Sequence, residues 1–164
     1  MKPSKSTNDY TKRALSYFQA IARIEKRYQF RAQYRQRLLS MAEGTSLRPL
    51  GTVGGGSLTG REELLARLTD LELELTQEMS HLQAIREQTW NLFSQLSHPM
   101  AGQLLEDFYL CGTTLHVIAA KMGYAERTAY KLKEMAMKEL GKLLEENAIE
   151  DPQPLSFTCN QEEE

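Results

Sequence analysis

The sequence predicts an all-α protein in which a long helical hairpin or coiled-coil arm precedes a C-terminal helix-turn-helix domain. Three observations support this fold class. Two long segments repeat apolar residues at steps of three and four, and a glycine-rich stretch separates them. Near the C-terminus, a shorter pattern consists of one helix, a glycine and a second helix, which is typical of a helix-turn-helix.

The first long segment, residues 1–43, is basic and predicts a single helix over about residues 7–42. Its apolar face consists of Ala14, Tyr17, Ile21, Ile24, Tyr28, Leu38 and Ala42. Only Arg31 and Arg35 interrupt this face. We expect the helix to end at Gly44, because glycine is a common C-terminal stop.

Residues 44–60 contain six glycines and one proline, which predicts a flexible loop. A glycine-rich phosphate-binding loop is the sharper alternative. The stretch lacks the Lys–Ser/Thr ending of a nucleotide-binding loop, and no strand precedes it. We therefore interpret it as a linker.

The second long segment, residues 61–97, is acidic and rich in leucine. We expect its helix to begin at residues 59–62, which have the form of a capping box. The coiled-coil seam consists of Leu64, Leu68, Leu71, Leu75, Leu82, Ile85, Leu92 and Leu96. Glu78 and Thr89 interrupt this seam, and Pro99 forbids a simple continuation of the helix.

The two long segments carry opposite charges. Residues 1–48 hold eleven basic and three acidic side chains, a net charge of +8, whereas residues 61–111 hold three basic and nine acidic ones, a net charge of −6. This predicts an antiparallel hairpin in which the basic helix lies along the acidic one. A dimer through the leucine seam is the competing arrangement, and both can hold at once. The basic helix either balances the acidic helix or leaves a face free for DNA phosphates.

Residues 99–147 are expected to form the helix-turn-helix domain. Three helices are predicted there, over residues 100–111, 115–122 and 125–147. The apolar faces of the last two helices consist of Leu115, Ile118, Ala119 and Met122, and of Ala129, Leu132 and Ala136. Gly123 follows Ala119 by four residues, and both are small where two helices must cross closely. In such a motif the second helix enters the DNA major groove.

The candidate DNA-binding residues lie mainly at the starts of these two helices. At the start of the second helix, the polar side chains that could reach base edges are Glu126, Arg127, Thr128, Tyr130 and Lys131. Arginine is suited to this role because it can bond bidentately to guanine. Thr113 or Thr114 can cap the first helix, whose N–H groups suit a phosphate. Lys121 and Lys133 are further candidates for phosphate contacts.

A wider residue pattern surrounds the two helices. It consists of Tyr109, Leu110, Cys111, Gly112, Thr114, Leu115, Ile118, Ala119, Met122, Gly123, Tyr124, Arg127, Tyr130 and Leu132. The pattern resembles the C-terminal part of phage-encoded ArpU/RinA-like transcriptional regulators, which in turn look like region 4 of sigma factors. The resemblance covers about residues 104–140. It implies a sequence-specific double-stranded DNA-binding regulator of phage or prophage genes, often those of late or structural gene expression.

The sequence departs from this family's pattern at Ala125, where a serine usually caps the second helix. Losing such a cap costs about 1 kcal/mol. Residues 112–147 hold six basic and five acidic side chains, and their net charge of +1 is low for a DNA-binding domain. We therefore expect a homodimer through the long helices, which would present two motifs to paired half-sites.

Several other classes of function fit the sequence less well. An enzyme is not expected, because no paired carboxylates, nucleophile–base set or nucleotide loop occurs in a setting that would form a pocket. Cys111, Cys159 and the three histidines lack metal-ligand spacing, so no metal or other cofactor is expected. Two alternatives remain open: a small terminase-like DNA recogniser for packaging, and a sigma-like adaptor that binds RNA polymerase.

The sequence also predicts where the protein works. No apolar run is long enough to span a bilayer, and the N-terminus lacks the apolar core of a secretion signal. We expect a protein of the bacterial host cytoplasm with no membrane partner. Residues 148–164 are acidic and contain two prolines, and we expect this tail to be disordered.

Overall fold

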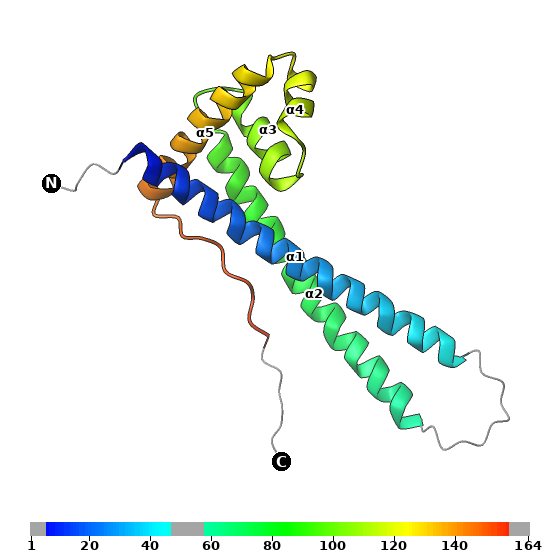
Figure 1. Ribbon diagram of the computed structural model, residues 1–164. Helices are drawn as coiled ribbons and strands as arrows, with labels where there is room; N and C mark the ends of the chain where they lie inside the picture. Colours follow the sequence, from blue (N-terminus) through cyan, green and yellow to red (C-terminus); the bar gives the residue numbers. More distant parts are fainter. Residues whose placement is uncertain (1–5, 47–57, 158–164) are drawn as a thin grey trace. The chain divides into compact units, whose positions relative to one another are not determined.

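The computed structural model describes residues 6–46 and 58–157, and the regular secondary structure in these ranges is entirely helical. The predicted all-α class is therefore confirmed. The helices are α1 (Thr7–Ser46), α2 (Leu58–Phe93), α3 (Ala101–Leu105), the π-helical turn η1 (Glu106–Leu110), α4 (Leu115–Met122) and α5 (Glu126–Glu146), all drawn in Figure 1. Within the described ranges, no helix is both long and apolar enough to cross a membrane.

The chain divides into two compact units. The bundle unit combines residues 1–23 with residues 84–153, so it contains the start of α1, the end of α2 and all the shorter helices. The hairpin unit combines residues 24–83 with residues 154–164. Each unit has buried apolar side chains of its own and is described separately.

In the hairpin unit, α1 and α2 run antiparallel (Figure 1). The core cluster consists of Leu38, Leu68, Leu71 and Leu75, with Tyr28, Ala32, Leu39, Ala42 and Leu64 packed against it. The apolar faces predicted for the two long segments therefore contact each other within one chain. Because this packing buries leucines of the α2 seam, it covers the surface that a seam-mediated dimer would need in this unit.

The residues that interrupt the two apolar faces meet across the hairpin. A guanidinium nitrogen of Arg31 donates to Oε1 of Glu78 at 3.0 Å, and Arg35 donates to Oε1 of Glu72 at 2.7 Å. Glu78 is only 1% exposed, so its carboxylate depends on arginine for its charge partner. Because higher numbers on α1 pair with lower numbers on α2, these ion pairs are consistent only with the antiparallel register. A buried polar pair of this kind can fix register.

In the bundle unit, the core lies between the start of α1, the end of α2 and the shorter helices. Its largest fully buried side chains are Tyr17, Ile21, Leu92, Leu104, Leu105, Ile118, Met137, Leu140 and Leu144, together with Thr89. The Thr89 hydroxyl donates to the carbonyl oxygen of Ile85, so it can accept a hydrogen bond from the Tyr17 hydroxyl 2.9 Å away. Thr89, which interrupts the predicted leucine seam, is therefore a satisfied polar group in the core.

The helix boundaries differ from the predicted ones at several places. Helix α1 continues through Gly44 to Ser46, and α2 begins at Leu58, one residue before the predicted capping box. A single glycine within a helix costs only about 1 kcal/mol relative to alanine, which explains why Gly44 does not end α1. The remainder of the predicted loop, residues 47–57, lies outside the described residues.

The helix predicted over residues 100–111 is two elements, α3 and η1. The backbone N–H of Cys111 donates to the carbonyl oxygen of Glu106 at 3.0 Å, five residues earlier, which is the hydrogen bond that defines a π-helical turn. The N–H of Thr113 then donates to the carbonyl oxygen of Asp107 at 2.8 Å. The segment therefore ends in a wider turn than the predicted α-helix.

The acidic tail also differs from its prediction. In the bundle unit, Arg13 donates to the carbonyl oxygen of Ile149 and to the carboxylate of Asp151, and Ser16 donates to Asp151 at 2.5 Å. In the hairpin unit, the Arg31 guanidinium lies 4.4 Å from the ring centroid of Phe157. The predicted disorder is therefore wrong for residues 149–157, because carboxylate and aromatic groups of the tail find cations on α1. Residues 158–164 lie outside the described residues.

Candidate nucleic-acid interface

Helices α4 and α5 are joined by a turn of three residues that begins at Gly123. The backbone of Gly123 is left-handed, with φ +71° and ψ 24°. Its N–H donates to the carbonyl oxygen of Ala120 at 3.3 Å, and the N–H of Tyr124 donates to that of Ala119 at 2.9 Å. This hydrogen-bonding pattern ends α4, and glycine suits it because a side chain strains a left-handed backbone.

The inner faces of α4 and α5 consist of small and branched apolar side chains. Ile118 and Ala119 of α4 are buried, as are three residues of α5, Ala129, Leu132 and Ala136. The other two residues predicted for the core face of α4, Leu115 and Met122, are only half-buried. Ala119 and Ala129 are small, which suits close packing of α4 and α5, and the buried face of α5 leaves its opposite side exposed.

The five predicted base-reading residues all lie on the exposed side at the start of α5. They are Glu126, Arg127, Thr128, Tyr130 and Lys131, and Tyr130 is 48% exposed. The structure thus brings them together on one accessible surface, next to the buried Ala129. It adds a neighbour that sequence reasoning missed, because Nδ1 of His116 on α4 lies 3.5 Å from the Glu126 carboxylate. These two residues are ten positions apart, so only the turn brings them into contact.

The predicted cap residues stand at the start of α4 without capping it through their side chains. Thr114 is the N-cap residue, but its hydroxyl makes no capping hydrogen bond, and the same is true of Ala125 before α5, which has no polar side-chain atom. Thr114 is exposed and Thr113 is half-buried. The first backbone N–H groups of both helices therefore have no side-chain cap. Such groups can donate hydrogen bonds to a bound anion.

The two predicted phosphate-contacting lysines have different environments. Lys121, near the end of α4, is exposed. Lys133 is half-buried, with its ammonium nitrogen 4.4 Å from the ring centroid of Phe108 and 5.3 Å from that of Tyr130. Two rings thus hold Lys133 by cation–π contact, which leaves it less available for a phosphate than Lys121.

An aromatic stack connects η1 to α1 in the bundle unit. The rings of Phe18 and Tyr109 are stacked at 4.6 Å with an interplanar angle of 6°, and Phe108 meets Tyr109 edge-on at 4.8 Å. Burial raises the pKa of Tyr109, so its hydroxyl is neutral over the whole physiological range. The stack continues through Phe108 to Lys133 and Tyr130, so the π-helical turn helps to position a predicted base-reading residue.

The protonation state of Tyr130 follows from its neighbour on α5. A hydrogen bond to Glu134, together with the charge of that carboxylate, raises the pKa of Tyr130. A raised pKa keeps the phenol protonated at neutral pH. The phenol donates its single hydrogen to Glu134, so the exposed hydroxyl oxygen can accept a hydrogen bond, for example from the amino group of a base.

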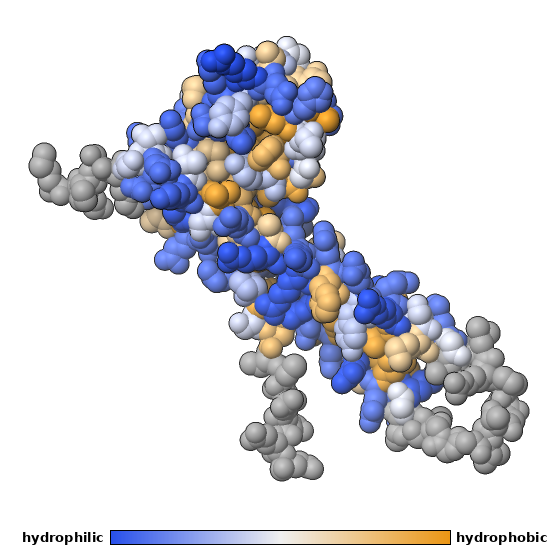
Figure 2. Space-filling view, viewed as in Figure 1, coloured by the Kyte–Doolittle hydropathy of each residue, from blue (hydrophilic) through white to orange (hydrophobic). Residues whose placement is uncertain are grey.

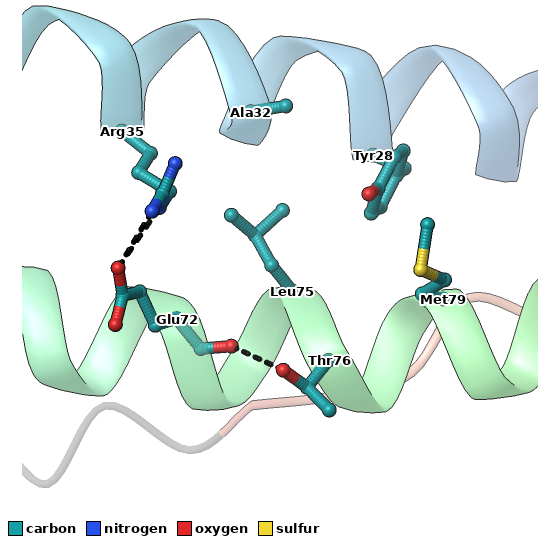
Figure 3. A pocket seen from close by; sticks show the side chains of 7 residues that line it. All are labelled: Tyr28, Ala32, Arg35, Glu72, Leu75, Thr76 and Met79. Atoms are coloured by element: carbon teal, nitrogen blue, oxygen red, sulfur yellow. Dashed lines mark hydrogen bonds and ion pairs between the residues drawn. The ribbon is translucent and has the colours of Figure 1, made fainter.

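A concave region lies on the hairpin unit, shown in Figure 3. It is a groove of about 450 Å³ lined by Tyr28, Ala32, Arg35, Glu72, Leu75, Thr76 and Met79. The Arg35–Glu72 ion pair crosses one end, and the Thr76 hydroxyl is occupied by the carbonyl oxygen of Glu72. Arg35, Glu72 and Thr76 are thus engaged with each other rather than directed at a shared point. Among the described residues, no cluster of three or more His, Cys, Asp or Glu side chains could hold a metal ion.

Compared with models of protein families, with curated proteins and with solved structures, the chain has no match. The resemblance to ArpU/RinA-like regulators therefore stays a prediction from the sequence.

Proposed function

We propose that the protein is a sequence-specific double-stranded DNA-binding transcriptional regulator of phage or prophage genes. The observation that carries this proposal is the exposed block of polar side chains at the start of α5, supported from behind by α4 through a tight glycine turn. A recognition helix reads bases with residues at this end. On this proposal the protein acts in the cytoplasm of a bacterial host cell.

Individual residues have distinct roles in the proposal. The Arg127 guanidinium can donate to both O6 and N7 of a guanine in the major groove. Glu126 can accept from the N4 amino group of cytosine, and Nδ1 of His116 on α4 lies 3.5 Å from its carboxylate. Lys131 lies one turn after Arg127 on the same exposed side of α5 and can contact a base or a phosphate.

The phosphate contacts in the proposal come from the start of α4 and from Lys121. The backbone N–H groups that follow Thr114 have no side-chain cap and can donate hydrogen bonds to a phosphate. Lys133 has a supporting role, because its cation–π contacts orient the Tyr130 ring. The charge of residues 112–147 is only +1, so these few contacts must provide most of this domain's attraction to the DNA backbone.

That low charge favours one second candidate, in which the sigma-like domain binds RNA polymerase and does not read DNA alone. The two functions differ in their dependence on salt. Binding to duplex DNA releases counterions and weakens steeply as salt rises. Polymerase binding by a chain that shows no salt-dependent affinity for DNA would select the adaptor.

The direct test compares variants of the full-length chain in gel-shift assays against fragments of a phage genome. Arg127→Ala and Lys131→Ala should each weaken binding to the preferred fragment, with Arg127→Ala costing about 1–3 kcal/mol, or roughly fivefold to one hundred and fifty-fold in affinity. Lys142→Ala is the matched control, because Lys142 is an exposed cation of α5 that lies near its far end and pairs with Glu146. Binding that is equal in all the variants would rule out α5 as the recognition helix.

A further inference from the structure

The cations of α1 in the hairpin unit fall into two sets. Arg27, Arg31 and Arg35 face α2 and form ion pairs with its carboxylates. Lys26 and Arg37 are exposed and have no ion-pair or hydrogen-bond partner among the described residues. The positive charge of α1 is therefore only partly neutralised by its own hairpin.

The two unpaired cations belong to a stripe that also carries exposed aromatic rings. We define the basic stripe as Lys26, Phe30, Tyr34, Arg37 and Met41. Phe30 is 70% exposed, and Tyr34 and Met41 are also exposed. The steps of four, four, three and four residues keep all five within about 80° around the helix. Figure 2 shows hydrophobic residues set among hydrophilic ones along the surface of α1.

Helix α2 carries an acidic stripe with the same spacing. We define it as Glu62, Ala66, Asp70, Leu73 and Gln77, and all five residues are exposed. Leu73 is 61% exposed. Glu62 and Asp70 have no ion-pair or hydrogen-bond partner among the described residues, and the stripe contains no cation. Each stripe therefore has unpaired charge of one sign together with exposed apolar side chains.

We propose that the basic stripe of α1 docks against the acidic stripe of α2 in a second copy of this chain. The two stripes are complementary: they carry opposite charges, share the 4-4-3-4 spacing, and each contains an exposed apolar residue. Helices with such repeats pack side by side, and flanking charges choose the partner. The inner seam cannot serve here, because the hairpin itself buries it.

The apolar residues favour a protein partner over nucleic acid. A DNA backbone would attract Lys26 and Arg37 but would not cover Phe30, whereas a helix with Leu73 and Ala66 removes that ring from water. Because every copy carries both stripes, two copies can make the contact reciprocally, and a head-to-tail arrangement would build larger assemblies. The inference does not depend on the proposed function of α5.

The test is a charge exchange measured as molar mass by sedimentation equilibrium. The wild-type chain should self-associate at micromolar concentration, more weakly at high salt. Lys26→Glu/Arg37→Glu gives two acidic stripes, and Glu62→Lys/Asp70→Lys gives two basic ones, so each variant alone should associate at least tenfold more weakly. Mixing the two variants restores opposite charges at every contact and should restore association. Circular dichroism checks that both variants remain helical.

The control variant is Lys12→Glu/Arg23→Glu, which changes the charge equally at exposed cations of α1 in the bundle unit and should leave self-association intact. A wild-type chain that stays monomeric, or a mixture no more associated than its components, would overturn the proposal. It would also be overturned if Lys26→Glu/Arg37→Glu lost affinity for duplex DNA while its molar mass matched that of the wild type. That outcome would assign the basic stripe to nucleic acid.

Discussion

At Gly141, α5 lies directly against the backbone of α1 in the bundle unit. A Cβ atom at this position would overlap the carbonyl oxygen of Tyr10. Gly44, in contrast, lies in α1 with nothing within 4 Å of an added Cβ atom. The two glycines thus have different roles, because one permits close packing of two helices and the other only lowers the helix propensity of α1.

This contrast predicts opposite effects of the same substitution. Gly141→Ala should lower the free energy of unfolding by about 1–3 kcal/mol, because the backbone of α1 must move away from the new methyl group. Gly44→Ala should raise it by roughly 0.5–1 kcal/mol, because alanine loses less conformational entropy in a helix. Urea unfolding of both variants measures the difference. A Gly141→Ala protein as stable as the wild type would show that α5 does not approach α1 so closely.

At the scale of the elements, the hairpin is held in register by polar residues within its apolar seam. Arg31 contacts both Glu78 and Glu74, at 3.0 and 3.5 Å, and Glu78 has almost no exposure to water. Arg27 is farther from Glu78, at 3.7 Å. The Arg35–Glu72 pair is closer in distance but more exposed, so water and salt screen it.

Removing one partner from each pair should therefore have unequal consequences. Arg31→Ala leaves the buried Glu78 carboxylate without its main partner and should cost about 3–5 kcal/mol of stability. Arg35→Ala, the matched control, should cost about 0–1 kcal/mol. The double variant Arg31→Met/Glu78→Leu should recover most of the loss, since apolar replacement of a buried ion pair is often neutral or stabilising. Equal losses of stability for Arg31→Ala and Arg35→Ala would contradict the claim that burial makes the Arg31–Glu78 ion pair the more important one.

Sequence reasoning predicted the elements whose signals are local. The boundaries of α4 agree with the prediction, because its apolar spacing and Gly123 lie within a few residues of each other. The breaks in the two apolar faces at Arg31 and Glu78 were also visible, although only the folded hairpin shows that they pair. The exposed block at the start of α5 follows from the same periodicity, since Ala129 and Leu132 identify the buried side.

Other features depend on contacts that no local pattern contains. The π-helical turn η1 arises from one hydrogen bond that skips a residue, and its sequence reads as an ordinary helix. Asp151 binds Arg13 across 138 positions, so composition alone suggested a disordered tail. The position of Lys133 over Phe108 likewise required the fold, because the two rings that hold the lysine come from different elements.

At the scale of the whole molecule, the opposite charges of the long segments are only partly neutralised by ion pairs within the chain. Several α1 arginines pair with carboxylates of α2 or of the tail, while Lys12, Arg23, Lys26 and Arg37 have no such partner among the residues described. We propose that the unpaired charge of the hairpin unit serves self-association. We propose separately that α5 reads the bases. A homodimer would then present two copies of α5 to DNA, which compensates for the low charge of each one.

The most direct test of DNA reading by α5 is methylation interference on a duplex bound by the full-length chain. Partial methylation of guanine N7 blocks a bidentate arginine contact in the major groove. The wild-type protein should fail to bind duplexes methylated at one or a few specific guanines. In Arg127→Ala, at least one of these guanines should tolerate methylation, while the others still interfere. Interference at no guanine, or an identical pattern for both proteins, would contradict the account.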